Sequence, residues 1–148
     1  MRVALGADDS TRVVDAIAEA LSAAGHQVTR YGKAAGENEA WGTTARRVGE
    51  AVASGEQALG VVCCWTGTGV SIAANKVPGV RAALCVDAET ARGARKWNDA
   101  NVLALSLRLT SVAVATEILT AWLAESYAGT EAESLAVLSA LDDRARGS

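Results

Sequence analysis

The chain has 148 residues, of which 50% are hydrophobic and 21% charged, and it carries a formal net charge of −3 at pH 7. This length can bury one hydrophobic core without disulfides or metals, and a mildly acidic chain lacks the basic surface that nucleic-acid binding requires. No apolar run approaches the length of a membrane span and no leader pattern opens the chain, so we expect a cytoplasmic protein with no membrane partner.

Apolar strands alternate with helices along the chain. Val3–Leu5 is a short apolar run that ends in turn residues, and Thr11–Ala24 has helical spacing with Gly25 as its stop. The other expected elements are, in chain order, a strand at His26–Tyr31, a helix at Thr43–Ser54, a strand at Leu59–Cys63, a helix at Thr68–Lys76, a strand at Val80–Val86, a helix at Glu89–Lys96, a strand at Asn101–Leu105, a helix at Ser111–Glu125 and, after Gly129, a helix to about Arg144.

This alternation predicts the fold class. Strands that are apolar throughout their length and alternate with helices form parallel sheets with both faces covered. We therefore expect one domain over residues 1–148, a three-layer α/β/α Rossmann-like sandwich with a five-stranded parallel sheet and a C-terminal helix.

Polar residues concentrate where expected strands pass into helices. The three segments are Asp8-Asp9-Ser10, Cys64–Ser71 and Trp97-Asn98-Asp99. Because ligands of such sheets bind beyond the carboxyl ends of the strands, we expect the three segments to lie together there. Gly67-Thr68-Gly69 can direct backbone amides at an anion, although glycine turns before helices are common and the phosphate-loop and dinucleotide motifs are absent.

The cysteines are Cys63, Cys64 and Cys85, an odd number that favours reduced thiols. No spacing with the single histidine, His26, suits zinc, so no metal is expected. Side chains alternate along a strand, so Cys63 and Cys64 should face opposite sides of the sheet. A thiol beside a helix N-terminus suits a nucleophile or base. Spacing alone favours the alternative that both are small buried hydrophobes.

The segment Cys64–Lys76, CWTGTGVSIAANK, closely resembles the signature of the ribose-5-phosphate isomerase B / galactose-6-phosphate isomerase family, C-G-T-G-x-G-x-S-I-A-A-N-K. Further family-like blocks at 79–85 and 98–105 extend the resemblance over roughly residues 1–128. The resemblance implies an aldose–ketose isomerase that acts through a cis-enediol(ate) and needs no metal or organic cofactor. It also implies an active site across a dimer interface, hence a homodimer or a dimer of dimers, with a C-terminal helix at about 131–144 that packs on a partner subunit.

The resemblance also assigns roles to individual residues. Cys64 matches the family's catalytic base, and Thr66 with the amides of Gly67 to Gly69 matches its oxyanion cradle. Asp8 and Asn98 match residues that bind the sugar, although turn and capping chemistry would also explain them. The expected substrate-binding residues are Asp8, Asp9, Trp41, Trp65, Gly67, Thr68, Gly69, Ser71, Trp97, Asn98 and Arg108.

The chain also departs from the family pattern. Asp9 and Trp97 stand where the family has histidines, Trp41 replaces a tyrosine, Trp65 replaces a glycine, and residues 128–133 are acidic where the family has arginines that hold phosphate. These changes predict a remodelled, Trp-rich pocket that turns over ribose 5-phosphate poorly and prefers another sugar, for example an unphosphorylated one stacked on Trp97. Two alternatives are an unaltered pentose-phosphate isomerase that uses other residues and a non-catalytic sugar- or nucleotide-binding protein.

Overall fold

Five parallel strands form the central sheet of the computed structural model, which describes residues 1–147. The strands are β1 Arg2–Ala7, β2 Gln27–Gly32, β3 Leu59–Cys64, β4 Ala82–Leu84 and β5 Val102–Ser106, in the order β2-β1-β3-β5-β4. Ala7 is in register with Gly32 of β2 and with Cys63 of β3, so the strands end at a common edge. The predicted five-stranded parallel sheet is confirmed.

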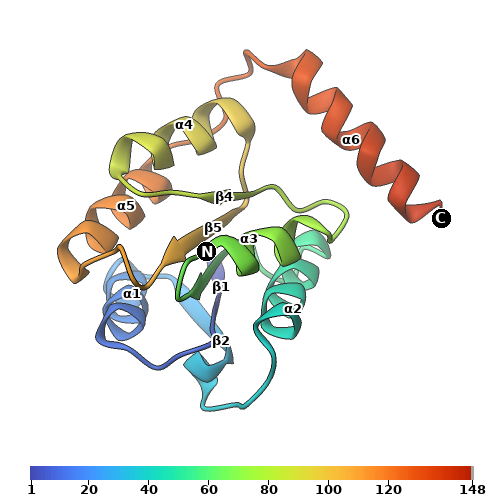
Figure 1. Cartoon of the computed structure of the whole chain (residues 1–148). Helices are drawn as coiled ribbons and strands as arrows, with labels where there is room; N and C mark the ends of the chain where they lie inside the picture. The colour runs from blue at the N-terminus through green and yellow to red at the C-terminus, as the bar shows by residue number, and fades with distance from the viewer. Residues whose placement is uncertain (148) are drawn as a thin grey trace.

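Helices cover both faces of this sheet (Figure 1). The helices are α1 Arg12–Ala23, the 3-10 helix η1 Lys33–Ala35, α2 Trp41–Ala53, α3 Thr68–Asn75, α4 Ala88–Asn98, α5 Val112–Ala124 and α6 Ala132–Arg146. Buried residues of α1, α4 and α5 share one core with the sheet, and those of α2 and α3 share a second core on the opposite face. The predicted three-layer sandwich is therefore confirmed.

The strand sequences explain the two cores. In β3, Val61 and Cys63 belong to the core under α1, α4 and α5, whereas Val62 and Cys64 belong to the core under α2 and α3. All six residues of β3 are buried, as expected of a central parallel strand. Alternation along this strand therefore directs the two neighbouring thiols to opposite sides of the sheet.

The C-terminal helix α6 stands apart from the sandwich (Figure 1). In the part of α6 that the structure describes no residue is buried, and Val137, Leu138 and Leu141 are between 40% and 57% exposed. A helix gains most of its stability in a protein by packing an apolar face. These side chains thus form an apolar surface on α6 that a further element could cover.

The structure differs from the predicted elements mainly at β4 and η1. The strand expected at Val80–Val86 is only Ala82–Leu84, because Val80 closes a turn on Val77 and the amide of Arg81 donates to the side chain of Asn101. The 3-10 helix Lys33–Ala35 was not predicted. None of the helices within residues 1–147 is long and apolar enough to cross a membrane.

Candidate active site

Cys64 is the last residue of β3, at the carboxyl edge of the sheet. It pairs with Ser106 of β5, and its carbonyl oxygen accepts a hydrogen bond of 2.9 Å from the amide of Leu107. The residue is 5% exposed, whereas Cys63 is completely buried and its burial raises the pKa of that thiol to about 12. Of the two neighbouring cysteines, Cys63 is a protonated core residue and Cys64 stands at the end of the strand.

The segment after Cys64 turns directly into α3. Gly67 is the N-cap of α3 and has a φ of 76°, and a Cβ there would lie 2.7 Å from the Leu84 side chain and 2.8 Å from the Leu105 carbonyl carbon. Only glycine fits this left-handed and crowded position. The first amides of a helix have no partner within it, and among residues 1–147 no side chain caps those of α3. Thr66 and Thr68 add two hydroxyls, whose oxygens are 2.7 Å apart.

These groups form what we call the amide cradle: the backbone amides of Gly67, Thr68 and Gly69 with the hydroxyls of Thr66 and Thr68. The positive end of the α3 dipole adds to their attraction for negative charge. Preorganised donors of this kind stabilise an oxyanion as it forms. A thiol at the end of β3 and an amide cradle at the start of α3 are therefore neighbours in the sequence and at the same sheet edge.

Trp41 closes one side of the amide cradle. It is the first residue of α2, and a Cβ built on Gly69 would lie 3.0 Å from its ring. The ring is thus in van der Waals contact with the first turn of α3, while the residue as a whole is 49% exposed. The structure therefore places the Trp41 ring at the amide cradle.

An acidic pocket opens beside this edge. Asp8, Asp9, Trp65 and Leu107 line a volume of about 260 Å³ at the carboxyl ends of β1, β3 and β5. Burial raises the pKa of Asp8, and the negative charge of Asp9 raises it further. A backbone hydrogen bond lowers this pKa but does not cancel the rise. Trp65 is 60% exposed. This pocket combines two carboxylates with a flat aromatic wall.

Two further predicted residues reach the same edge. The amide of Arg108 donates to the carbonyl of Trp65 at 2.9 Å, which places the exposed Arg108 next to the acidic pocket. Ser71 lies on the first turn of α3, where its amide donates to the Gly67 carbonyl at 3.2 Å. Leu107 was missed by the sequence analysis, because nothing in its local pattern distinguishes it from a core leucine.

The prediction that the Trp97-Asn98-Asp99 segment joins this edge is wrong for a single chain. Trp97 and Asn98 end α4, which starts at the carboxyl edge and runs back to the amino edge before β5 begins. There the Trp97 ring packs on its own helix, 2.8 Å from the Cβ position of Gly93. Asn98 lines a different pocket, of about 410 Å³, with residues such as Arg81 and Leu138.

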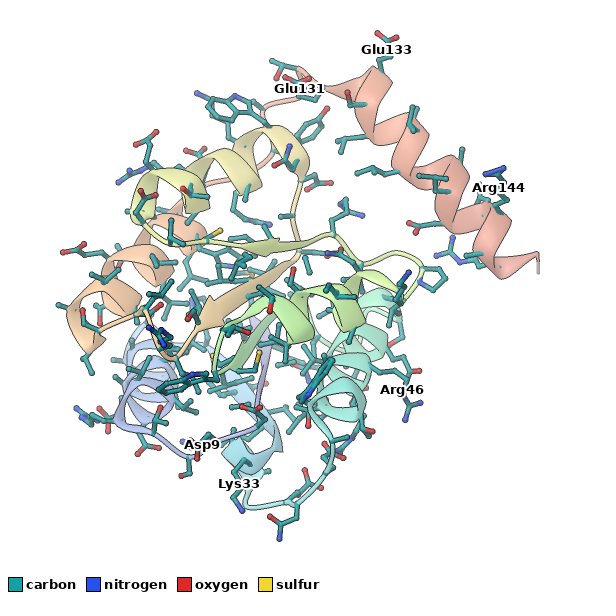
Figure 2. The ribbon with its side chains drawn as sticks, viewed as in Figure 1. Asp9, Lys33, Arg46, Glu131, Glu133 and Arg144 are labelled. Carbon is teal, nitrogen blue, oxygen red and sulfur yellow. The ribbon has the colours of Figure 1, made fainter. Side chains whose placement is uncertain are left out.

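The acidic C-terminal stretch is also far from the acidic pocket of its own chain. Figure 2 shows Glu131 and Glu133 at the start of α6 on one side of the molecule, and Asp9 on the opposite side near Lys33. Within one chain, the acidic stretch that stands where the family has arginines therefore does not reach this pocket. Separately, among residues 1–147 no three His, Cys, Asp or Glu side chains are grouped so that they could hold a metal ion.

Comparison with known proteins identifies similar sequences and structures. A family profile described as Ribose/Galactose Isomerase matches residues 3–137. The D-erythrulose-4-phosphate isomerase of Pectobacterium atrosepticum is 37% identical over 87% of this chain and 86% of its own length. Ribose-5-phosphate isomerase B of Clostridium thermocellum superposes with a TM-score of 0.91 at 36% identity, over 97% of this chain and 99% of that one. The type B enzyme of Trypanosoma brucei gives a TM-score of 0.88 at 39% identity, over 95% and 97% of the two chains.

Proposed function

The chain belongs to the ribose/galactose isomerase family, and from this premise we propose that Cys64 is the base that moves a proton between adjacent carbons of a small sugar phosphate. Relatives such as these are named isomerases, which favours an isomerase over the non-catalytic binding protein considered above. The observation that carries the proposal is the position of Cys64 at the end of β3, directly before the amide cradle.

The proposed reaction follows from these groups. The Cys64 thiolate removes the proton from the carbon next to the sugar carbonyl, and the electron pair of that C–H bond becomes the C–C double bond of an enediolate. The carbonyl π electrons move to oxygen, where Thr66 and the amides of the cradle stabilise the negative charge. The proton of the hydroxyl on the adjacent carbon passes to the enediolate oxygen, and the thiol delivers its proton to the former carbonyl carbon. The adjacent carbon becomes the new carbonyl, so aldose becomes ketose with no net change in atoms or electrons.

We further propose that a second copy of the chain completes the site. Asn98 lies at the opposite edge of the sheet from Cys64 of its own chain. In the family resemblance, however, it matches an asparagine that binds the substrate. Apolar side chains are exposed on the elements that such a copy would cover, including Ile72 of α3 at 61% and the apolar surface of α6. Packing α6 on a neighbour would bury that surface.

This arrangement predicts a dimer or a dimer of dimers in solution. Light scattering at micromolar concentration is expected to give two or four times the 15.1 kDa mass of the chain. Charging the apolar surface with Leu138→Glu and Leu141→Glu should shift the mass toward the monomer, because charges are costly to bury at such an interface. The exposed Val86→Glu, on the segment between β4 and α4, is the control and should leave the mass unchanged. A wild-type protein that is only monomeric would contradict the proposal.

The proposed substrate is a short sugar phosphate. Trp65 lines the acidic pocket at a position where the family has glycine, and one relative is named for a four-carbon substrate, D-erythrulose 4-phosphate. We expect this tetrulose phosphate to be isomerised with a kcat/KM at least about tenfold above that of ribose 5-phosphate, a difference of roughly 1.4 kcal/mol in transition-state binding.

The variant Trp65→Gly tests the role of the ring in this selectivity. Removing the indole should raise kcat/KM for ribose 5-phosphate and lower the ratio between the two substrates toward one. Unphosphorylated ribose and erythrulose complete the panel, because Asp8 and Asp9 could serve a neutral sugar. A wild-type kcat/KM of roughly 10⁴ M⁻¹s⁻¹ or more for ribose 5-phosphate would contradict the proposed remodelling.

A further inference from the structure

Arg47 of α2 joins two glutamates from the loop that precedes its helix. Its Nη1 donates to Oε1 of Glu39 at 2.8 Å and to Oε1 of Glu37 at 3.1 Å. The hydroxyl of Thr44, also on α2, donates to the same Oε1 of Glu39 at 2.9 Å. Two side chains of the helix therefore hold one carboxylate of the loop, and we call this group the Glu39–Arg47 clamp.

The Glu39–Arg47 clamp is partly buried. The side chain of Glu39 is 19% exposed and that of Arg47 34%, and the guanidinium lies 5.1 Å from the centre of the buried Tyr31 ring. Burial would raise the pKa of Glu39, but hydrogen bonds from Thr44 and Arg47 outweigh it and lower that pKa. The Glu39 carboxylate thus stays charged, and a shielded pair of this kind orders its loop more strongly than an exposed pair does.

The loop held by the clamp ends at Trp41. Glu39 stands two residues before Trp41, with only Ala40, the N-cap of α2, between them. The Trp41 ring lies against Gly69 in the amide cradle, although α2 has no side-chain cap among the described residues to fix its first turn. Glu39 supplies that restraint from outside the helix, through its bonds to Thr44 and Arg47.

We propose that the Glu39–Arg47 clamp is a positioning device that holds the Trp41 ring against Gly69 and so makes it a fixed wall of the amide cradle. Glu39 and Arg47 touch no substrate in this arrangement; they act through Trp41. With the clamp released, the ring leaves Gly69, and the cradle loses contact area with a bound sugar. The effect on substrate rests on the proposed function, whereas the effect on the ring does not.

Acrylamide quenching measures the ring directly. The background variant carries Trp65→Phe and Trp97→Phe, which leaves Trp41 and Trp122 as its tryptophans. Trp122 is fully buried, so Trp41 is the indole that acrylamide can reach. Adding Trp41→Phe to the background gives the Trp122 fluorescence, which is subtracted. Glu39→Gln and Arg47→Met are each expected to raise the quenching constant of Trp41 about twofold, because a released ring samples solvent more freely. Arg46→Met is the matched control, because Arg46, on the outer face of α2 (Figure 2), forms an ion pair with the exposed Glu50 and acts on Glu39 through its charge without a hydrogen bond.

A double-mutant cycle then tests the link to substrate. Glu39→Gln is expected to raise KM for D-erythrulose 4-phosphate roughly three- to tenfold with little change in kcat, and to have no further effect in a Trp41→Ala background. Additive effects, or unchanged quenching in Glu39→Gln and Arg47→Met, would overturn the proposal. If Glu39→Gln does not fold, Thr44→Val removes one bond to Glu39 and takes its place in both measurements. Absence of turnover with any sugar would refute the proposed function, while the quenching result would still decide the clamp.

Discussion

Replacing Cys64 by alanine is expected to lower kcat by roughly 10²- to 10⁴-fold, the usual contribution of a general base. The side chain is small and lies at the end of a strand that both neighbours hold, so the variant should keep its fold and melt near the wild-type temperature. Turnover of D-erythrulose 4-phosphate, followed as the appearance of the aldose, measures the loss.

Cys63→Ala is the matched control. The two cysteines are neighbours in sequence, but the Cys63 thiol faces the opposite core and its pKa is raised to about 12 by burial, so it cannot act as a base near neutrality. This variant should lose about 1 kcal/mol of stability or less and retain nearly full activity. Full activity in Cys64→Ala would transfer the role of base to another group near the cradle, of which Thr68 and Ser71 are the first to examine.

Asn98→Ala is expected to abolish most activity for a different reason. If Asn98 completes the site of a second copy, the homodimer of this variant has two sites with Cys64 but without the asparagine. Unfolding and refolding it with an equal amount of Cys64→Ala should produce mixed dimers. In half of the dimers one of the two sites is then intact, so the mixture should recover roughly a quarter of wild-type activity.

This recovery separates a shared site from one confined to a single chain. Two inactive variants that damage the same chain's site cannot restore each other, so mixing would give no activity. Refolded wild-type protein supplies the yield of the procedure, and each variant refolded alone supplies the background. Failure to recover activity, with normal yields and masses, would contradict the completion of the site by a second copy.

The sheet and its helices could be predicted because their signals are local. Strand β3 is apolar throughout, α1 has helical spacing with Gly25 after it, and the alternation of Cys63 and Cys64 follows from the two-residue period of a strand. The length of β4 could not be predicted in this way, because Val80 and Arg81 are diverted by a turn and by the Asn101 side chain.

The candidate site was predictable in part. Cys64 ends a strand, and Asp8, Gly67 and Arg108 lie in the segments that follow strands, so the rule for parallel sheets places them at one edge. The same rule does not extend to Trp97 and Asn98, because they end a helix and precede a strand and therefore lie at the other edge.

Contacts that depend on how elements approach one another carried no sequence signal. The Trp41 ring on Gly69 requires α2 and α3 to pack side by side, and the Glu39–Arg47 clamp requires the loop before α2 to fold back on that helix. Neither Glu37, Glu39 nor Arg47 follows a periodic pattern or a known motif. Such tertiary contacts decide how the amide cradle is enclosed, and the structure was needed to find them.

Proton exchange with solvent during turnover shows whether Cys64 is the base that forms an enediolate. In D₂O, wild-type protein with D-erythrulose 4-phosphate or ribose 5-phosphate should give an isomer that carries deuterium at the carbon next to its carbonyl, seen by NMR. Deuterium enters because the enediolate is reprotonated by a thiol that exchanges with solvent. This role of Cys64 predicts interconversion with deuterium incorporation in the wild type, and neither in Cys64→Ala. Interconversion without deuterium, or incorporation that persists in Cys64→Ala, would contradict it.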